Sequence, residues 1–119
     1  MKIVINRCHG GFGLSNAAFE KLLERKGIAF DCAPGKAKMV GNDYYEAGHS
    51  GDRKRLLFEF DYYEHRNDPD LIAVVEEMGE SSHSWAAELR IVEIPDDVEW
   101  EIAEYDGLEW VAEKHRTWE

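Results

Sequence analysis

The sequence predicts an α/β fold of the α+β class: a mostly antiparallel sheet with two helices packed on it and a C-terminal β-hairpin. Asp106-Gly107 stands between two alternating runs, the strongest short-range signal of a hairpin. Two segments carry apolar residues at helical spacing behind residues that favour helix N-termini. The chain opens with a strand, a glycine-rich turn and a helix. At 119 residues, with no repeat or linker, we expect residues 1–119 to form a single domain.

The first elements follow from the opening residues. Ile3, Val4 and Ile5 predict a largely buried strand over residues 2–7. After the glycines, apolar residues at helical spacing predict a helix over 17–26. Its expected N-cap is Ser15 or Asn16, and Gly27 is the expected stop.

The middle of the chain is the least regular part. Residues 31–52 contain Pro34 and four glycines, which predicts mostly loop with a short strand near Tyr44-Tyr45. The apolar run at 56–60 is a strand candidate. Ahead of it lies the basic cluster Arg53-Lys54-Arg55, with Lys36 and Lys38 upstream. Its alternation favours a solvated strand edge over an anion site.

The second half contains clearer signals. Asp68-Pro69 is a strong helix start, and Gly79 is the expected end of that helix. Residues 88–94 alternate as a strand that Pro95 closes. Residues 100–105 and 108–113 are the two strands of the hairpin, joined by a type I′ turn at Asp106-Gly107.

The two-residue turn fixes the register of this hairpin. Tyr105 is expected opposite Leu108, Ala103 opposite Trp110 and Ile102 opposite Val111. The same register sets Glu104 opposite Glu109, a like-charge pair that destabilises a hairpin. A cationic partner or a basic residue from elsewhere in the chain would relieve it.

Charge is unevenly distributed. The net charge is −11, of which residues 1–58 contribute +4 and residues 59–119 contribute −15. Because so acidic a chain repels nucleic-acid backbones, we expect no direct DNA or RNA binding.

The apolar runs of the sequence are too short for a membrane span or a signal peptide. Two cysteines only, Cys8 and Cys32, predict reduced thiols and a cytoplasmic location.

The glycine-rich turn is the first candidate ligand site. Gly10, Gly11 and Gly13 around Phe12 would offer free backbone N–H groups at a helix N-terminus, a physically sound anion site. Arg7 and His9 stand beside it in sequence. Neither a P-loop nor a dinucleotide fingerprint fits this spacing. A tight turn of positive-φ glycines is the alternative interpretation.

The C-terminal tail is the second candidate. Arg116 could bind a phosphate through two hydrogen bonds, and His115 could add another. Trp118 could stack on a base. The alternative is an ordinary surface ion pair and a Trp that pins the chain end to the core.

Catalytic and metal signals are weak. Cys8 and His9 are sequence neighbours, and neighbours on a strand point apart. The five histidines lack zinc-ligand spacing. We therefore expect neither catalytic residues, nor a metal site, nor a cofactor.

Several segments together carry a resemblance: residues 1–6, the turn from Gly10 to Ser15, residues 91–96, Glu104 to Gly107 and His115 to Trp118. On these segments the chain resembles a family of small hypothetical proteins of tailed bacteriophages and prophages. The resemblance covers most of the chain and implies an accessory protein that blunts host defence.

The residues and the resemblance lead to three functional hypotheses. The first is a non-catalytic sponge that sequesters a small phosphate-bearing nucleotide, such as a cyclic oligonucleotide or an ADP-ribose derivative, in a homo-oligomer. The second is an acidic inhibitor that imitates nucleic acid and binds a basic host protein, supported by eight carboxylates and no Lys or Arg between Asp96 and Glu113. The third is a small nucleotide hydrolase.

Overall fold

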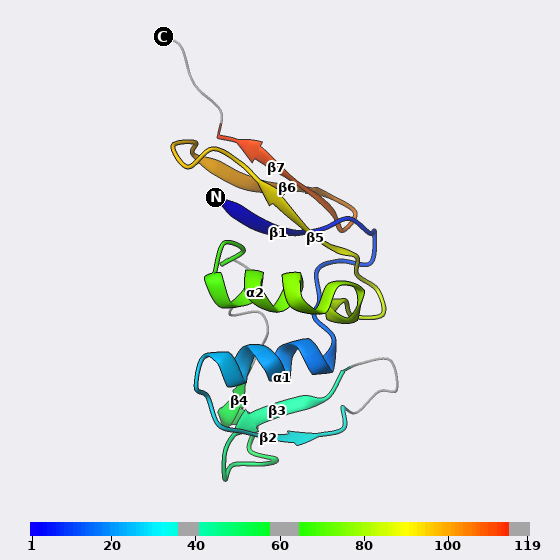
Figure 1. Cartoon of the computed structure of the whole chain (residues 1–119). Coiled ribbons are helices and arrows are strands. Elements are labelled where there is room, and N and C mark those ends of the chain that lie inside the picture. Colours follow the sequence, from blue (N-terminus) through cyan, green and yellow to red (C-terminus); the bar gives the residue numbers. More distant parts are fainter. Residues whose placement is uncertain (36–40, 58–64, 115–119) are drawn as a thin grey trace.

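A computed structural model describes residues 1–35, 41–57 and 65–114. It has α+β architecture, in which two helices lie between antiparallel sheets (Figure 1). The chain order of these elements is β1 (Lys2–Asn6), α1 (Asn16–Arg25), β2 (Phe30–Ala33), β3 (Asp43–Glu46), β4 (Leu56–Leu57), α2 (Pro69–Met78), β5 (Leu89–Glu93), β6 (Trp100–Tyr105) and β7 (Leu108–Glu113).

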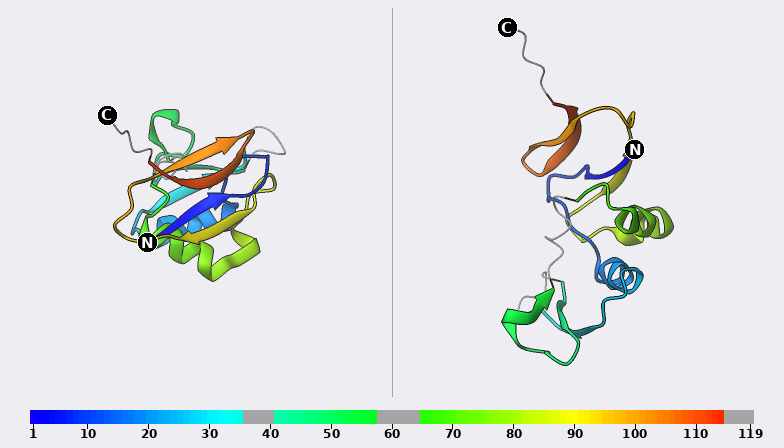
Figure 2. Two further views of the ribbon diagram at one scale, coloured as in Figure 1. Left: turned by 90° about the horizontal axis from the view of Figure 1, so that it is seen from above. Right: turned by 90° about the vertical axis from the view of Figure 1, so that its left-hand side faces the viewer.

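The elements form successive layers. The β6–β7 hairpin lies beside the β1–β5 pair, followed by α2, α1 and the small β2–β3–β4 sheet (Figure 1). The same order is seen from a second direction in Figure 2. The predicted fold class is therefore confirmed, although the strands form three small sheets instead of one.

Both helices begin and end where their capping residues indicate. Ser15 caps α1 by accepting a hydrogen bond from Ala18 N (3.1 Å). Asp68 caps α2 by accepting one from Leu71 N (2.9 Å), with Pro69 in the first turn. Gly79, with φ 56°, ends α2.

The core lies where the two helices meet the β1–β5 pair. β1 and β5 are antiparallel, with Val4 opposite Ile91. Val4 packs in one buried cluster with side chains from both helices, including Leu22, Leu71 and Val74. Fully burying a side chain of this size contributes roughly 1.5–3 kcal/mol relative to exposure. This core fixes β1 against α2, and so positions the turn that follows β1.

The small sheet covers the other side of α1. Tyr44 is buried there, with its ring edge-on to Phe19 of α1 at a centroid distance of 5.0 Å. The strand expected near Tyr44-Tyr45 is confirmed as β3. Residues 31–52 were expected to be mostly loop, but β2 pairs with β3 because Phe30 also packs against Tyr44. β2 was thus missed.

The basic cluster differs from its prediction. Arg53–Arg55 forms a 3-10 turn capped by Asp52, not an alternating strand edge. The Asp52 carboxylate accepts from Lys54 N (3.0 Å), which favours a turn over extension. β4 comprises Leu56–Leu57, and the remainder of the expected strand, 58–60, lies outside the described residues, as do Lys36 and Lys38.

The hairpin has the predicted register. Tyr105 lies opposite Leu108, Ala103 opposite Trp110 and Glu104 opposite Glu109. Asp106 (φ 51°) and Gly107 (φ 87°) both have positive φ, as a type I′ turn requires. Among the described residues, no helix is long and apolar enough to cross a membrane.

Candidate functional site

A pocket of about 510 Å³ opens between the glycine-rich turn and the segment that leads into β5. We call it the glycine-loop pocket. Its volume lies within the range typical of small-molecule sites. Its wall is formed by residues from four parts of the chain: 10–16, Phe19, Gly41 and 83–86.

Close backbone packing explains the glycines of this turn. A Cβ on Gly10 would lie 1.9 Å from Ala86 O, so only glycine allows the two segments to approach. Gly11 has φ 91° and a Cβ there would meet nothing within 4 Å, so the requirement at Gly11 is conformational. Gly13 O accepts from Ser84 N (3.1 Å), and Ser15 N donates to Ser82 O (2.9 Å). The turn is thereby fixed to residues 82–86.

The N-terminus of α1 forms one side of the pocket. The first turn of α1, all within the described chain, has no acidic residue, whereas α2 has Asp70 there. Ser15 Oγ takes the Ala18 N–H, so an anion here would meet the N–H groups of Asn16 and Ala17 and the positive end of the helix dipole. Asn16 borders the same rim, and its Oδ1 accepts from Asn42 N (2.9 Å). That bond holds the segment after residue 40 beside the pocket.

His83 has one defined donor. Its Nδ1 lies 2.8 Å from Leu89 N and accepts that backbone hydrogen bond. In the neutral imidazole the proton is therefore on Nε2, which makes Nε2 the donor. His83 lines the pocket and is the one ionisable group among the described lining residues.

Trp85 supplies an exposed aromatic surface at the pocket. Its side chain is 74% exposed, the largest value among the described large hydrophobic residues. An exposed indole beside polar N–H groups is a suitable stacking surface for a flat ring. Sequence reasoning missed Trp85, because the loop around it shows no periodic pattern.

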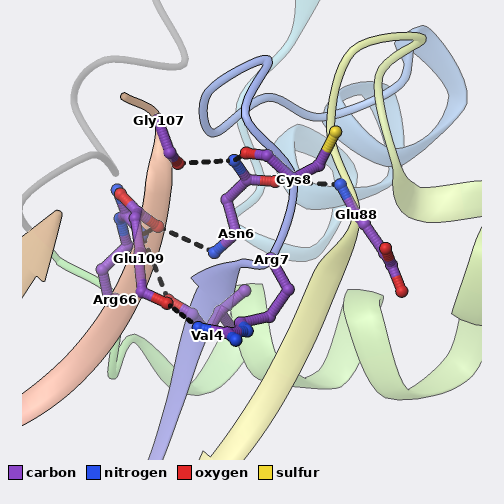
Figure 3. A network of polar contacts seen from close by, with 8 residues as sticks. All are labelled: Val4, Asn6, Arg7, Cys8, Arg66, Glu88, Gly107 and Glu109. Atoms are coloured by element: carbon purple, nitrogen blue, oxygen red, sulfur yellow. Dashed lines mark hydrogen bonds and ion pairs between the residues drawn. The ribbon is translucent and has the colours of Figure 1, made fainter. Parts of the chain in front are cut away.

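Phe12 connects the pocket to a buried ion pair. It lines the pocket and packs partly against the core, and the Arg66 guanidinium carbon lies 3.9 Å from its ring centroid. Arg66 is 1% exposed and binds both carboxylate oxygens of Glu109, at 2.7 and 2.8 Å (Figure 3). The basic residue expected to relieve the Glu104–Glu109 repulsion is thus Arg66.

Asn6 connects the same network to the glycine-rich turn. Its backbone N–H donates to Glu109 Oε1 (2.7 Å), and its Nδ2 donates to Cys8 O (2.5 Å) and Gly107 O (2.8 Å) (Figure 3). Its Oδ1 accepts from Glu88 N (2.9 Å). The strand pattern gave no sign that Asn6 is fully buried and joins four segments.

The predicted site residues separate into three groups. Gly10, Gly11, Phe12 and Gly13 line the pocket. Arg7 and His9 contact the hairpin instead: Arg7 Nη1 donates to Glu109 O (2.8 Å), and His9 Nδ1 lies 3.2 Å from Asp106 O. The tail residues His115, Arg116 and Trp118 lie outside the described residues.

The pocket wall offers limited catalytic chemistry. Ser15 Oγ donates to Ser81 O (2.6 Å) and accepts from Ala18 N, so its hydroxyl serves the helix cap. His83 uses Nδ1 for the backbone. Across residues 1–35, 41–57 and 65–114, no group of three or more His, Cys, Asp or Glu side chains could hold a metal ion.

Comparison with protein families, curated proteins and solved structures finds no match to this chain.

Proposed function

We propose that the protein binds and sequesters a small phosphate-bearing nucleotide in the glycine-loop pocket without converting it. The observation that carries this proposal is one pocket in which the N-terminus of α1 and an exposed indole, Trp85, line the same space. A nucleotide has an anionic part and a flat aromatic part, and this wall offers one surface to each.

The phosphate would lie at the first turn of α1. The N–H groups there carry partial positive charge, and His83 Nε2 adds a side-chain donor. The nearby Glu88 carboxylate pairs with Arg90 (2.8 Å). The hydrogen bond from Arg90 lowers the pKa of Glu88, so this carboxylate is charged at neutral pH but has its own counterion.

The base would stack on Trp85. Base stacking on an aromatic side chain is worth roughly 1–3 kcal/mol and tolerates different bases. Phe12 lines the same pocket against Arg66 and would offer a second aromatic contact. These contacts favour a nucleotide over inorganic phosphate.

The residues that line the glycine-loop pocket are better suited to holding a nucleotide than to hydrolysing it. A hydrolase needs a nucleophile or an activated water next to a base. Ser15 Oγ bonds the backbone as donor and acceptor, and His83 Nδ1, the nitrogen that would accept a proton, already accepts from Leu89 N. The resemblance to small phage proteins adds a setting: a host cytoplasm in which a cyclic oligonucleotide or ADP-ribose derivative signals infection. A homo-oligomer with the pocket near a subunit interface remains part of this proposal.

Fluorescence titration with ADP-ribose and a cyclic dinucleotide tests the proposal. We expect at least one of them to bind, and Trp85→Ala to weaken that binding about tenfold or more. Trp110→Ala is the matched control, because Trp110 is a partly exposed indole on the hairpin and not in the pocket wall. Equal loss in both variants, or binding unchanged by Trp85→Ala, would contradict the proposal.

A further inference from the structure

The outward face of the β6–β7 hairpin is apolar. Side chains alternate across a strand pair, so the observed register places one set of residues together on this face. Tyr105 and Trp110 are diagonal neighbours in that set and are 73% and 42% exposed. The full set is Glu101, Ala103, Tyr105, Leu108, Trp110 and Ala112; we call it the outer hairpin face.

The opposite face of the hairpin is fixed against the protein. Glu109 lies on it, is 2% exposed and binds Arg66 and Asn6 N. If the hairpin were rotated so that its apolar face turned inward, the bonds of Glu109 would break. A charge buried in the interior would lose its partner, at a cost of several kcal/mol. The outer hairpin face is therefore held toward the surface by a specific polar contact, despite its apolar character.

The rim of this face selects the charge of a partner. Seven carboxylates on and around the hairpin are exposed: Asp96, Asp97, Glu99, Glu101, Glu104, Asp106 and Glu113. Residues 91–113 contain no Lys or Arg. Two copies of this rim brought together would repel each other, whereas a basic segment would be attracted. A homo-oligomer of this protein would accordingly use a different surface.

From these observations we propose that the outer hairpin face is a docking surface for a basic protein segment that carries apolar side chains. Leucine-like side chains would cover Tyr105 and Trp110, and Arg or Lys side chains would meet the rim. Aromatic anchors of this kind dominate the energetics of many protein interfaces. None of the residues of this face lines the glycine-loop pocket, so the proposal does not rest on nucleotide binding.

Synthetic peptides test this surface. The probe is a peptide of alternating arginine and leucine, compared with arginine–serine and serine–leucine peptides. We expect the arginine–leucine peptide to bind at least about tenfold more tightly than either control. Tyr105→Ser with Trp110→Ser should abolish that preference, and Trp85→Ser should keep it. Raising salt from about 0.05 to 0.5 M should weaken the binding steeply.

Three outcomes would overturn the inference. The first is equal binding of all three peptides, or none. The second is a preference that persists in the Tyr105→Ser/Trp110→Ser variant while circular dichroism shows it to be folded. The third is a wild-type dimer, seen by analytical ultracentrifugation, that this variant abolishes, because the face would then belong to a second copy of the chain.

Discussion

Arg66 and Glu109 form a buried, two-hydrogen-bond ion pair that joins the segment before α2 to the hairpin. Nη1 and Nη2 of Arg66 lie 2.7 and 2.8 Å from the two oxygens of Glu109, and both side chains are almost completely buried. Arg66 also binds both backbone groups of Val4. Arg66 O accepts from Val4 N (2.9 Å), and Arg66 Nη1 donates to Val4 O (3.2 Å). The pair therefore closes the free edge of β1 and orients the hairpin.

Breaking this pair should destabilise the fold strongly. Glu109→Gln removes the carboxylate that binds both terminal nitrogens of the buried Arg66, so we expect a loss of about 3–5 kcal/mol in the free energy of unfolding. Urea denaturation measures it. Glu104→Gln is the control: Glu104 lies opposite Glu109 but is exposed, and its replacement should change stability by less than about 0.5 kcal/mol. Similar small effects for both variants would show that the pair is not buried as described.

Removing both charges should restore part of that loss. Arg66→Met combined with Glu109→Leu also eliminates the Arg66 charge, so this double variant should be more stable than Glu109→Gln. It should remain below wild type, because Asn6 N would lose its acceptor at a cost of about 1–3 kcal/mol. Full recovery would mean that Asn6 finds another partner.

The glycine-rich turn offers a matched pair of substitutions. The methyl group of Gly11→Ala would meet open space, and the only penalty is the positive φ at this position. The variant should therefore lose about 1 kcal/mol in the free energy of unfolding. Gly10→Ala places a methyl group into Ala86 O and must move residues 84–86. Nucleotide affinity should therefore fall far more in Gly10→Ala, since Trp85 is displaced. A larger affinity loss in Gly11→Ala would argue against this geometry.

Asp68 should make the fold sensitive to acid. Burial raises its pKa, but hydrogen bonds from Lys26 and Leu71 N outweigh burial and hold the pKa below its usual value of 3.8. Burial likewise lowers the Lys26 pKa, yet Asp68 and Asp70 raise it above 10.5 overall. The stabilisation from ionised Asp68 is thus present above about pH 4 and lost as pH falls through its folded pKa.

Asp68→Asn isolates this effect, because Asn retains a cap acceptor but not the charge. Wild type should be more stable than the variant by about 1 kcal/mol at pH 7, and the difference should shrink as pH falls below about 4 and the Asp68 carboxylate becomes protonated. Urea unfolding over this pH range measures it. A difference that stays constant, or grows, as pH falls would contradict the lowered pKa.

Local signals predicted most of the fold. Ser15, Asp68 and Gly79 set helix ends through contacts within a few residues, and the turn at Asp106-Gly107 fixed the hairpin register. β2 was missed because its stabilisation comes from Phe30 packing against Tyr44, a contact that forms only after the chain returns.

The candidate site was only partly predictable. The glycines marked one wall of the pocket, but Trp85 and His83 come from a loop that periodicity cannot place beside them. Which face of the hairpin is buried is even harder to predict from the sequence. Hydrophobicity favours the face with Tyr105 and Trp110 as the inner one, yet Glu109 is buried because Arg66, 43 residues earlier, neutralises it.

Ligand retention tests the proposed function most directly. Purified protein would be incubated with cyclic dinucleotides, cyclic trinucleotides and ADP-ribose derivatives, desalted and denatured, and the released compounds identified by mass spectrometry. We expect one nucleotide to be recovered intact from the wild type and from Trp110→Ala, and not from Trp85→Ala. Recovery of no nucleotide would contradict binding in the glycine-loop pocket, and a chemically converted nucleotide would replace sequestration with hydrolysis.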